Sequence, residues 1–292
     1  MTPGRAALVD AARQSIAKGS KSFALASRLF APVTRERAWL LYSWCRACDD
    51  LADGQQHGGA LAAGHDTGAA LATIRELTAR ALNREETGEP AFDALGLVVA
   101  ECNIPHAYVN DLITGFAMDA EDFSPRTTED MLTYCYHVAG AVGLMMAIVM
   151  GVDPDDQATL GHAKDLGMAF QIANIMRDIS EDADAGRCYL PATMLGKADI
   201  PPGEHMRQHH RVALSGIAAK LAEMAAGYEA SARRGARALP FRSRWAVLAA
   251  AGIYGDIARE VTRRGTTAWD SRVITSKSAK LGWVARALIA AR

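Results

Sequence analysis

Along most of the chain, apolar residues recur every three or four positions, which is the spacing of an amphipathic helix. No segment alternates apolar and polar residues as a half-buried strand does. Helix-start signals stand at the breaks: Thr34 is a candidate cap, Thr127 with Asp130 resembles a capping box, and Asp153-Pro154 resembles an N-cap followed by Pro at N1. The pattern therefore predicts an all-α protein.

The predicted helices are separated by short polar breaks. They cover 34–53, 69–82, 90–102, 105 to about 120, 127–151, 153–182, 207–238, 241–264 and 276–291. A Gly/His-rich loop is expected over 54–68, and a second loop carries the sequence AGRCYLP at 185–191. Because no repeat and no Pro/Gly/Ser linker divides the chain, residues 1–292 are predicted to form a single domain.

Composition supports a helical fold and excludes several classes of protein. Alanine, the best helix former, supplies 57 of the 292 residues. Half of the chain is hydrophobic, which argues against disorder. The formal net charge of −1 gives no support to a nucleic-acid partner.

The cysteines and the N-terminal sequence favour a cytoplasmic protein. The first 20 residues contain charged positions and no continuous apolar stretch of a signal peptide. The longest apolar run, 139–152, has 14 residues, whereas a membrane span needs about 20. Five cysteines are an odd number, as expected for reduced thiols. Cys45-x-x-Cys48 is read as helix packing, with zinc or redox chemistry as the alternative.

The first candidate site is the acidic helix end YSWCRACDDLAD. Asp49 and Asp53 are four residues apart and share one helix face, and Tyr42, Arg46 and Asp50 fall near the same stripe. Like charges one turn apart destabilise a bare helix slightly. A cation between them would remove that repulsion, whereas the alternative is a solvated acidic end.

The second candidate site is a row of polar residues inside an apolar helix. Phe170, Asn174, Asp178 and Asp182 are spaced by four, and their flanking positions are apolar. Burying such a row is unfavourable unless something pairs with it. An amide oxygen and two carboxylates are ligands that Mg²⁺ prefers, with waters and substrate phosphates completing its shell.

Basic and hydroxyl side chains offer candidate phosphate contacts. The segment GSKSF at 19–23 combines a flexible backbone with two hydroxyls and a cation, although a helix cap is the simpler interpretation. Neither a P-loop nor a dinucleotide glycine fingerprint occurs. Further candidates for anion contacts are Arg46, Arg177, Arg187, Lys197, Arg264 and Arg272.

The segment 134–146 (YCYHVAGAVGLMM) combines apolar residues with glycines. Gly140 and Gly143 either allow close helix packing or leave room for a long apolar ligand. A C20 prenyl chain is on the order of 20 Å long, which matches about 13–14 residues of helix. Plain core packing is the alternative. His137 has no His or Cys partner at a ligand spacing and is read as a hydrogen-bonded residue.

Together these motifs resemble the squalene/phytoene synthase family. The resemblance rests on GSKSF, YSWCRACDDLAD, YCYHVAG, AWDSR and above all the unbroken DLGMAFQIANIMRDISEDADAGRCYLP. It implies a single isoprenoid-synthase-type helical domain around a central cavity, with two Asp-rich motifs that bind Mg²⁺ (or Mn²⁺) and prenyl diphosphate. By resemblance, the catalytic residues are Tyr42, Arg46, Asp49, Asp53, Asp178 and Asp182, and the metal ligands are Asp49, Asp53, Asn174, Asp178 and Asp182. The implied substrate-binding residues are Ser20, Ser22, Phe23, Tyr134, Gln171, Asn174, Arg177, Tyr254 and Arg272.

The implied reaction is the Mg²⁺-dependent head-to-head condensation of two geranylgeranyl diphosphates. It passes through a cyclopropyl diphosphate to phytoene, releases diphosphate and serves carotenoid biosynthesis. No NADPH is expected. The alternatives are squalene, dehydrosqualene or hydroxysqualene synthesis from farnesyl diphosphate, a class I terpene cyclase, and a non-catalytic relative that acts as an interaction protein.

The C-terminal region suggests contact with a membrane surface. Residues 259–292 hold eight Lys/Arg and two acidic residues, and the last predicted helix is amphipathic. It either rests on the anionic inner face of a membrane or packs on the domain. The pattern leaves the oligomeric state open.

Overall fold

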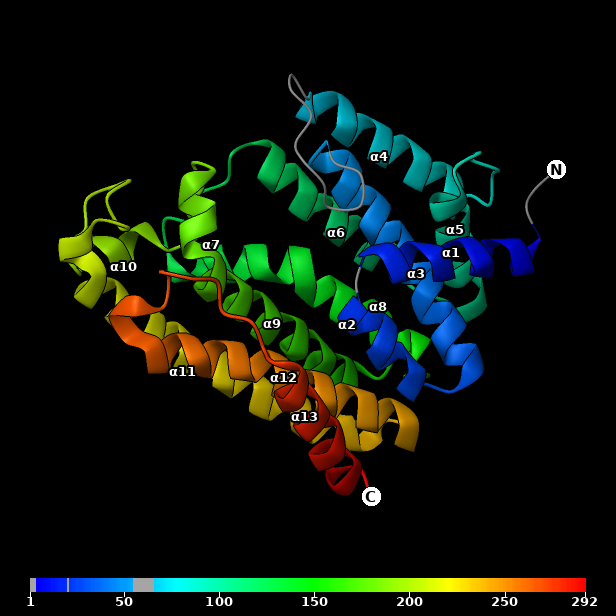
Figure 1. The fold of residues 1–292 in the computed structure, drawn as a ribbon. Helices are drawn as coiled ribbons and strands as arrows, with labels where there is room; N and C mark the ends of the chain where they lie inside the picture. The colour runs from blue at the N-terminus through cyan, green and yellow to red at the C-terminus, as the bar shows by residue number, and fades with distance from the viewer. Residues whose placement is uncertain (1–3, 20, 55–65) are drawn as a thin grey trace.

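The computed structural model describes residues 4–19, 21–54 and 66–292, and this part of the chain contains helices and no strand (Figure 1). The α-helices are α1 (Arg5–Gly19), α2 (Lys21–Ala26), α3 (Pro32–Ala52), α4 (Thr67–Leu82), α5 (Pro90–Cys102), α6 (His106–Ala120), α7 (Thr128–Cys135), α8 (Ala141–Val149), α9 (Gln157–Asp184), α10 (Ala192–Gly196), α11 (Arg211–Gly235), α12 (Phe241–Arg264) and α13 (Lys277–Ala290). A π-helical segment, η2 (Tyr136–Gly140), joins α7 to α8. The predicted all-α class is confirmed.

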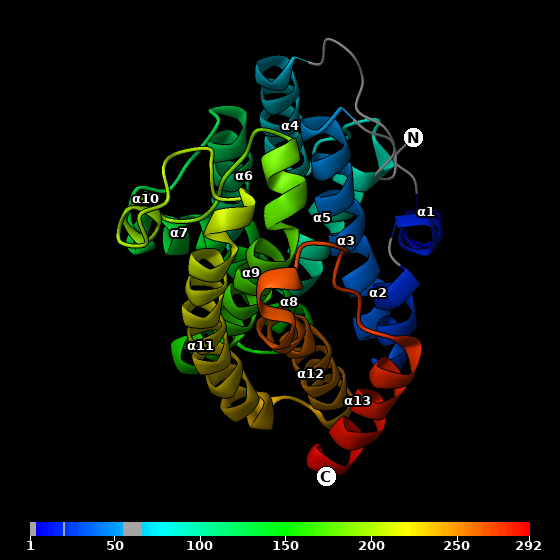
Figure 2. The ribbon, with the colours of Figure 1, turned by 60° about the vertical axis from the view of Figure 1, so that its left-hand side comes forward.

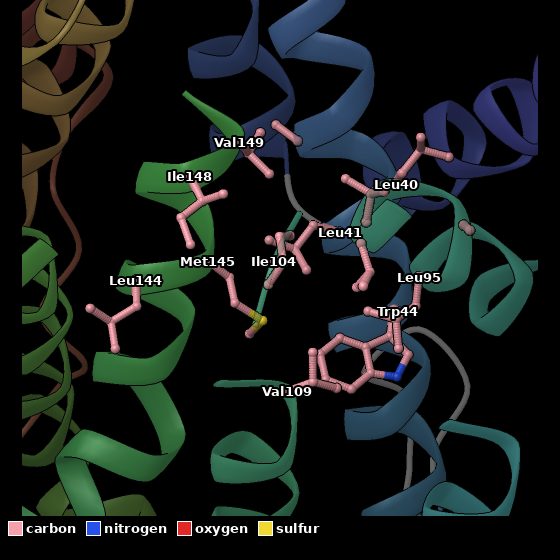
Figure 3. Close-up of a cluster of buried hydrophobic side chains, with 14 of the residues drawn as sticks. Leu40, Leu41, Trp44, Leu95, Ile104, Val109, Leu144, Met145, Ile148 and Val149 are labelled. Atoms are coloured by element: carbon pink, nitrogen blue, oxygen red, sulfur yellow. The ribbon is translucent and has the colours of Figure 1, made fainter. Parts of the chain in front are cut away.

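The described residues form two large hydrophobic cores and a small third cluster between α12 and α13. In the first, the buried Leu41 and Trp44 of α3 lie opposite Met145 and Ile148 of α8 (Figure 3). The second core unites residues of α7, α9, α11 and α12. Helix α8 contacts both α3 and α9. Helix α3 belongs to the first core, whereas α9 contributes Leu160 to the first core and its later residues to the second. Figure 2 shows α13 on the outside of the bundle, against α12.

Local chemistry explains several helix starts and shows that two predicted starts are wrong. The capping box is confirmed, since the Thr127 hydroxyl accepts from the Asp130 amide and the Asp130 carboxylate accepts from the Thr127 amide. The prediction that Thr34 caps a helix is wrong, because Pro32 already occupies the first turn, where its missing N–H costs nothing. The Asp153-Pro154 start is also wrong. The carboxylate of Asp156 accepts from the Thr159 amide and begins α9 three residues later.

The predicted helix 127–151 corresponds to α7 and α8, with the π-helical segment η2 between them. Its glycines serve close packing: a Cβ on Gly143 would overlap the Ala163 carbonyl of α9, and one on Gly140 would press on Tyr136 and Lys164. By length and composition, Thr128–Val149 is apolar enough to cross a membrane. Half of the tested window is buried inside the fold, as expected of a helix at the centre of a helical bundle.

Some elements have boundaries that periodicity does not give. Helices α1, α2 and α10 were not predicted. The predicted helix 207–238 is α11 flanked by two 3₁₀ turns, Gln208–His210 and Ala236–Ala238. Helix α4 begins two residues earlier than expected, because Asp66 caps it. Residues 55–65 of the predicted Gly/His-rich loop lie outside the described part of the chain.

Candidate active site

The two acidic motifs line one cavity of about 230 Å³. Asp49 and Asp53 reach it from the last turn of α3, and Asp178 and Asp182 reach it from the second half of α9. The i,i+4 spacing places each pair of carboxylates on one helix face, as predicted. The fold therefore brings together acidic residues that are about 130 positions apart in the sequence.

The electrostatics of this cavity disfavour several adjacent negative charges. Solvent reaches Asp49 through the cavity, but the protein atoms around it desolvate the carboxylate and, together with Asp53, raise its pKa to about 7. Burial and the neighbouring Asp178 raise the pKa of Asp182 to about 6. The side-chain oxygen of Asn174, Oδ1, is buried without a hydrogen-bond partner. A cation would stabilise all three groups, so this donor set fits a hard divalent metal ion.

Within the described residues, the group of His, Cys, Asp and Glu side chains whose ligand atoms all lie within 4.8 Å of one another is Glu204, His209 and His210. This group lies before α11 and does not line the acidic cavity. Within it, a carboxylate oxygen of Glu204 is 3.8 Å from His210 Nε2.

An apolar cavity of about 390 Å³ adjoins the acidic one. Gln171 and Asn174 line both cavities and so mark where they meet. Phe23 and Tyr42 line the apolar cavity with their rings 5.4 Å apart, and Tyr254 lines it while stacking on Phe170 at 4.0 Å. Tyr134, which is also expected to contact substrate, lines the acidic cavity.

Three of the predicted basic residues, Arg46, Arg177 and Arg272, lie beside the acidic motifs and pair with carboxylates. Two others are not brought to the site: Arg264 pairs with Glu260 on α12, and Lys197 is exposed after α10. Arg46 pairs with Asp50 one turn away on α3. Arg177 donates to Asp178 at 2.7 Å, and Arg272 lies 2.8 Å from the same carboxylate. Because these guanidinium groups gather at the acidic cavity without lining either cavity, they are placed to meet an anion that binds there.

The GSKSF segment approaches the same region. A Cβ on Gly19, at the end of α1, would press on the Tyr42 hydroxyl and on the side chain of Arg46. Ser20 lies outside the described residues, and for Ser22 the backbone alone is described, within α2. The two predicted serine contacts therefore remain predictions.

Three further side chains of the acidic cavity are Asp119, Arg187 and Tyr189. Asp119, from the end of α6, accepts from Tyr189 at 2.8 Å and from Tyr134 at 3.2 Å. Burial raises its pKa. Asp119 is not among the predicted site residues, although Glu121 and Asp122 stand close to it in the sequence. Arg187 is one of the predicted anion contacts, and Tyr189 lies in the predicted loop AGRCYLP.

Two predictions about other polar residues are confirmed. His137 is hydrogen-bonded, with Nδ1 3.0 Å from the Asp111 carbonyl oxygen. All five cysteines are free thiols. Cys48 is fully buried in the first core and burial raises its pKa well above the ordinary range, which fits a packing role.

Comparison with known proteins identifies the family. The model of the family described as squalene/phytoene synthase matches residues 16–279, and the chain belongs to that family. The phytoene synthase of Pseudescherichia vulneris is 45% identical over 276 residues, which cover 94% of this chain and 89% of that protein. The 15-cis-phytoene synthase of Enterobacter agglomerans is 45% identical over 268 residues, covering 90% and 89%.

Solved structures agree with the all-α isoprenoid synthase fold. The crystal structure of a dehydrosqualene synthase in complex with ligand matches with a TM-score of 0.86 at 25% identity, over 97% of this chain and 96% of that one. Squalene synthase HpnC from Alicyclobacillus acidocaldarius matches with a TM-score of 0.77 at 26% identity, over 88% and 94%.

Proposed function

We propose that this protein condenses two geranylgeranyl diphosphates head to head to form phytoene, as a prenyltransferase of carotenoid biosynthesis. The observation that carries the proposal is the junction at Gln171 and Asn174, where a carboxylate-lined cavity opens onto an apolar one. That arrangement suits a ligand with a polyanionic head and a long hydrocarbon tail. The bacterial relatives at 45% identity are phytoene synthases, which supports the C20 substrate.

In this proposal Asp49, Asp53, Asn174, Asp178 and Asp182 hold Mg²⁺. When bound, Mg²⁺ neutralises the diphosphate and makes it a better leaving group. Arg177 and Arg272 exchange their contacts with Asp178 for contacts with the diphosphate oxygens. The apolar walls exclude water, which would otherwise quench an allylic cation. The rings of Phe23 and Tyr42 stabilise positive charge near the junction through their π faces.

Product analysis tests this function. We expect the purified protein with MgCl₂ to release diphosphate from the C20 substrate and to form a C40 hydrocarbon, identified by mass spectrometry without added NADPH. Chelation with EDTA should abolish release, and added Mg²⁺ should restore it, because the carboxylates cannot neutralise a diphosphate themselves. If neither C15 nor C20 diphosphate is turned over across a range of metals and detergents, the enzyme assignment is wrong.

A C15 reaction is the second candidate. Solved structures similar to this chain include a dehydrosqualene synthase and a squalene synthase, and the acidic cavity alone does not distinguish chain lengths. The same assay separates the two, because two C15 substrates give a C30 product. A C30 product formed at the higher kcat/KM would replace the C40 proposal.

We also propose that the protein works in the cytoplasm, at the inner face of a membrane, and docks through α13. The inner face of α13 packs on α12, where Trp245 donates to the Val284 carbonyl at 2.8 Å. On its outer face, Leu281 and Ile289 are 64% and 76% exposed, beside the exposed Lys277 and Arg286. Exposed apolar side chains flanked by cations complement an anionic lipid surface.

Liposome flotation tests this contact. We expect the protein to float with vesicles of anionic phospholipid and to stay with the soluble fraction when the vesicles are zwitterionic. The double variant Leu281→Ser/Ile289→Ser should reduce the floated fraction at least fivefold. The matched control is Val212→Ser on α11, which removes an apolar side chain that is 74% exposed elsewhere. Equal flotation of both variants would exclude α13 as the docking face.

A further inference from the structure

A polar triad stands in the wall of the apolar cavity. His162 of α9 lines the cavity, and its Nδ1 lies 2.8 Å from the Ser231 hydroxyl of α11. Ser231 in turn donates to the Asp165 carboxylate at 2.5 Å. Hydrogen bonds on two sides of the hydroxyl fix the orientation of the imidazole ring. The reaction at the acidic cavity makes no use of this triad.

The other side of the His162 ring lies against backbone. A Cβ added to Gly235 would overlap Cβ, Cγ and Cδ2 of His162. Gly235 has an ordinary helical conformation, with φ −65° and ψ −28°, so glycine is needed there for space and not for its backbone freedom. The ring is thus held by Ser231 and Gly235, and a displacement away from Gly235 moves it toward the cavity.

His162 lies at a defined depth in the cavity. The lining follows α9 from Asn174, where the cavities meet, to Thr159, and His162 stands twelve positions from Asn174. At 1.5 Å per residue this is about 18 Å, close to the length on the order of 20 Å of a C20 chain. A C15 chain, three quarters as long at about 15 Å, ends about 3 Å, or two helical residues, before His162.

We infer that His162, held by Ser231 and Asp165 and backed by Gly235, forms the wall near the far end of the cavity and sets the length of prenyl chain the cavity accepts. This inference rests on the proposed function, because it places the diphosphate head at the junction. The fourth isoprene unit of a C20 substrate then lies beside the imidazole ring, and a C25 substrate meets the ring. His162 is a specificity-determining residue in this role, and Ser231 is a positioning residue.

Gly235→Ala tests the inference by moving the wall inward. The new methyl group must displace His162 into the cavity, so we expect the ratio of kcat/KM for C20 over C15 diphosphate to fall at least tenfold. The matched control is Gly227→Ala on the same helix, where a Cβ meets nothing within 4 Å, and it should leave the ratio unchanged. Adding His162→Gly to Gly235→Ala removes all three overlapping atoms, Cβ included, and should restore the ratio to within threefold of the wild-type value.

His162→Ala tests the wall independently of how Gly235→Ala folds. Without the ring, we expect the ratio of kcat/KM for C25 over C20 diphosphate to rise at least tenfold. If Gly235→Ala lowers C15 and C20 turnover by the same factor, or if His162→Ala leaves C25 discrimination unchanged, the end wall is elsewhere. Those outcomes differ from failure of the proposed function, in which the wild-type protein with Mg²⁺ turns over no C20 substrate at all.

Discussion

Asp182→Asn is expected to stop turnover while making the metal-free protein more stable. Turnover should fall at least 100-fold, about the loss caused by removing one group that stabilises transition-state charge. The apo protein should nevertheless gain about 2 °C in Tm at pH 8, the shift expected from about 1 kcal/mol in a chain of this size. The gain arises because burial and Asp178 raise the pKa of Asp182 to about 6, so its charged form is unfavourable in the fold.

The pH dependence of the gain follows from the sign of that shift. An acid whose pKa is higher in the folded state lowers stability above about pH 6 and has no such effect below about pH 4, where it is protonated in both states. The Tm difference between Asp182→Asn and wild type, measured by circular dichroism with EDTA present, should therefore shrink as the pH falls through this window. Asp184→Asn, an exposed position two residues further along α9, is the matched control for both measurements. A stable, fully active Asp182→Asn protein would remove Asp182 from the metal site.

The acidic motifs were predictable because helix geometry alone puts residues four apart on one face. Asp49 with Asp53, and Asn174 with Asp178 and Asp182, follow from that rule and from the unfavourable burial of unpaired carboxylates. No comparable local pattern in the sequence predicts that α3 and α9 line one cavity. Residues of α4, α6 and α7 complete their common cavity, and here the family resemblance supplied the prediction that spacing did not.

Asp119 and the His162 triad show what local pattern misses. Asp119 acquires its place through two tyrosine hydroxyls, one of them 70 residues away in the chain. His162 is one polar residue in a helix, and its partner Ser231 is 69 residues further on. Side chains whose roles come from tertiary hydrogen bonds leave no periodic signal. The same reasoning explains the late start of α9, since Asp153 and Asp156 are equally plausible caps until the preceding turn is known.

A pair of identical substitutions on α9 is expected to have opposite effects on stability. Gly167→Ala should lower the free energy of unfolding by about 1–3 kcal/mol, the usual result of overpacking. Its Cβ would overlap the Ala139 carbonyl group and lie 2.9 Å from the Gly140 Cα, and backbone atoms cannot rotate away as a side chain can. Gly161→Ala meets nothing within 4 Å inside the same helix, and should raise the free energy of unfolding by about 0.5–1 kcal/mol because it removes a flexible residue.

Gly167→Ala is also expected to be the less active of the two variants. Gly167 lines the apolar cavity, and relief of the clash must push α9 away from η2, which displaces Gln171 and Asn174 at the junction of the two cavities. We therefore expect Gly167→Ala to lose at least tenfold in kcat/KM for the prenyl diphosphate, whereas Gly161→Ala keeps the wild-type value. Urea unfolding at pH 8 and diphosphate release measure the two effects on the same preparations. Equal stability of the two variants would mean that close contact between η2 and α9 does not position the junction, and the glycines of the apolar lining would then need another explanation.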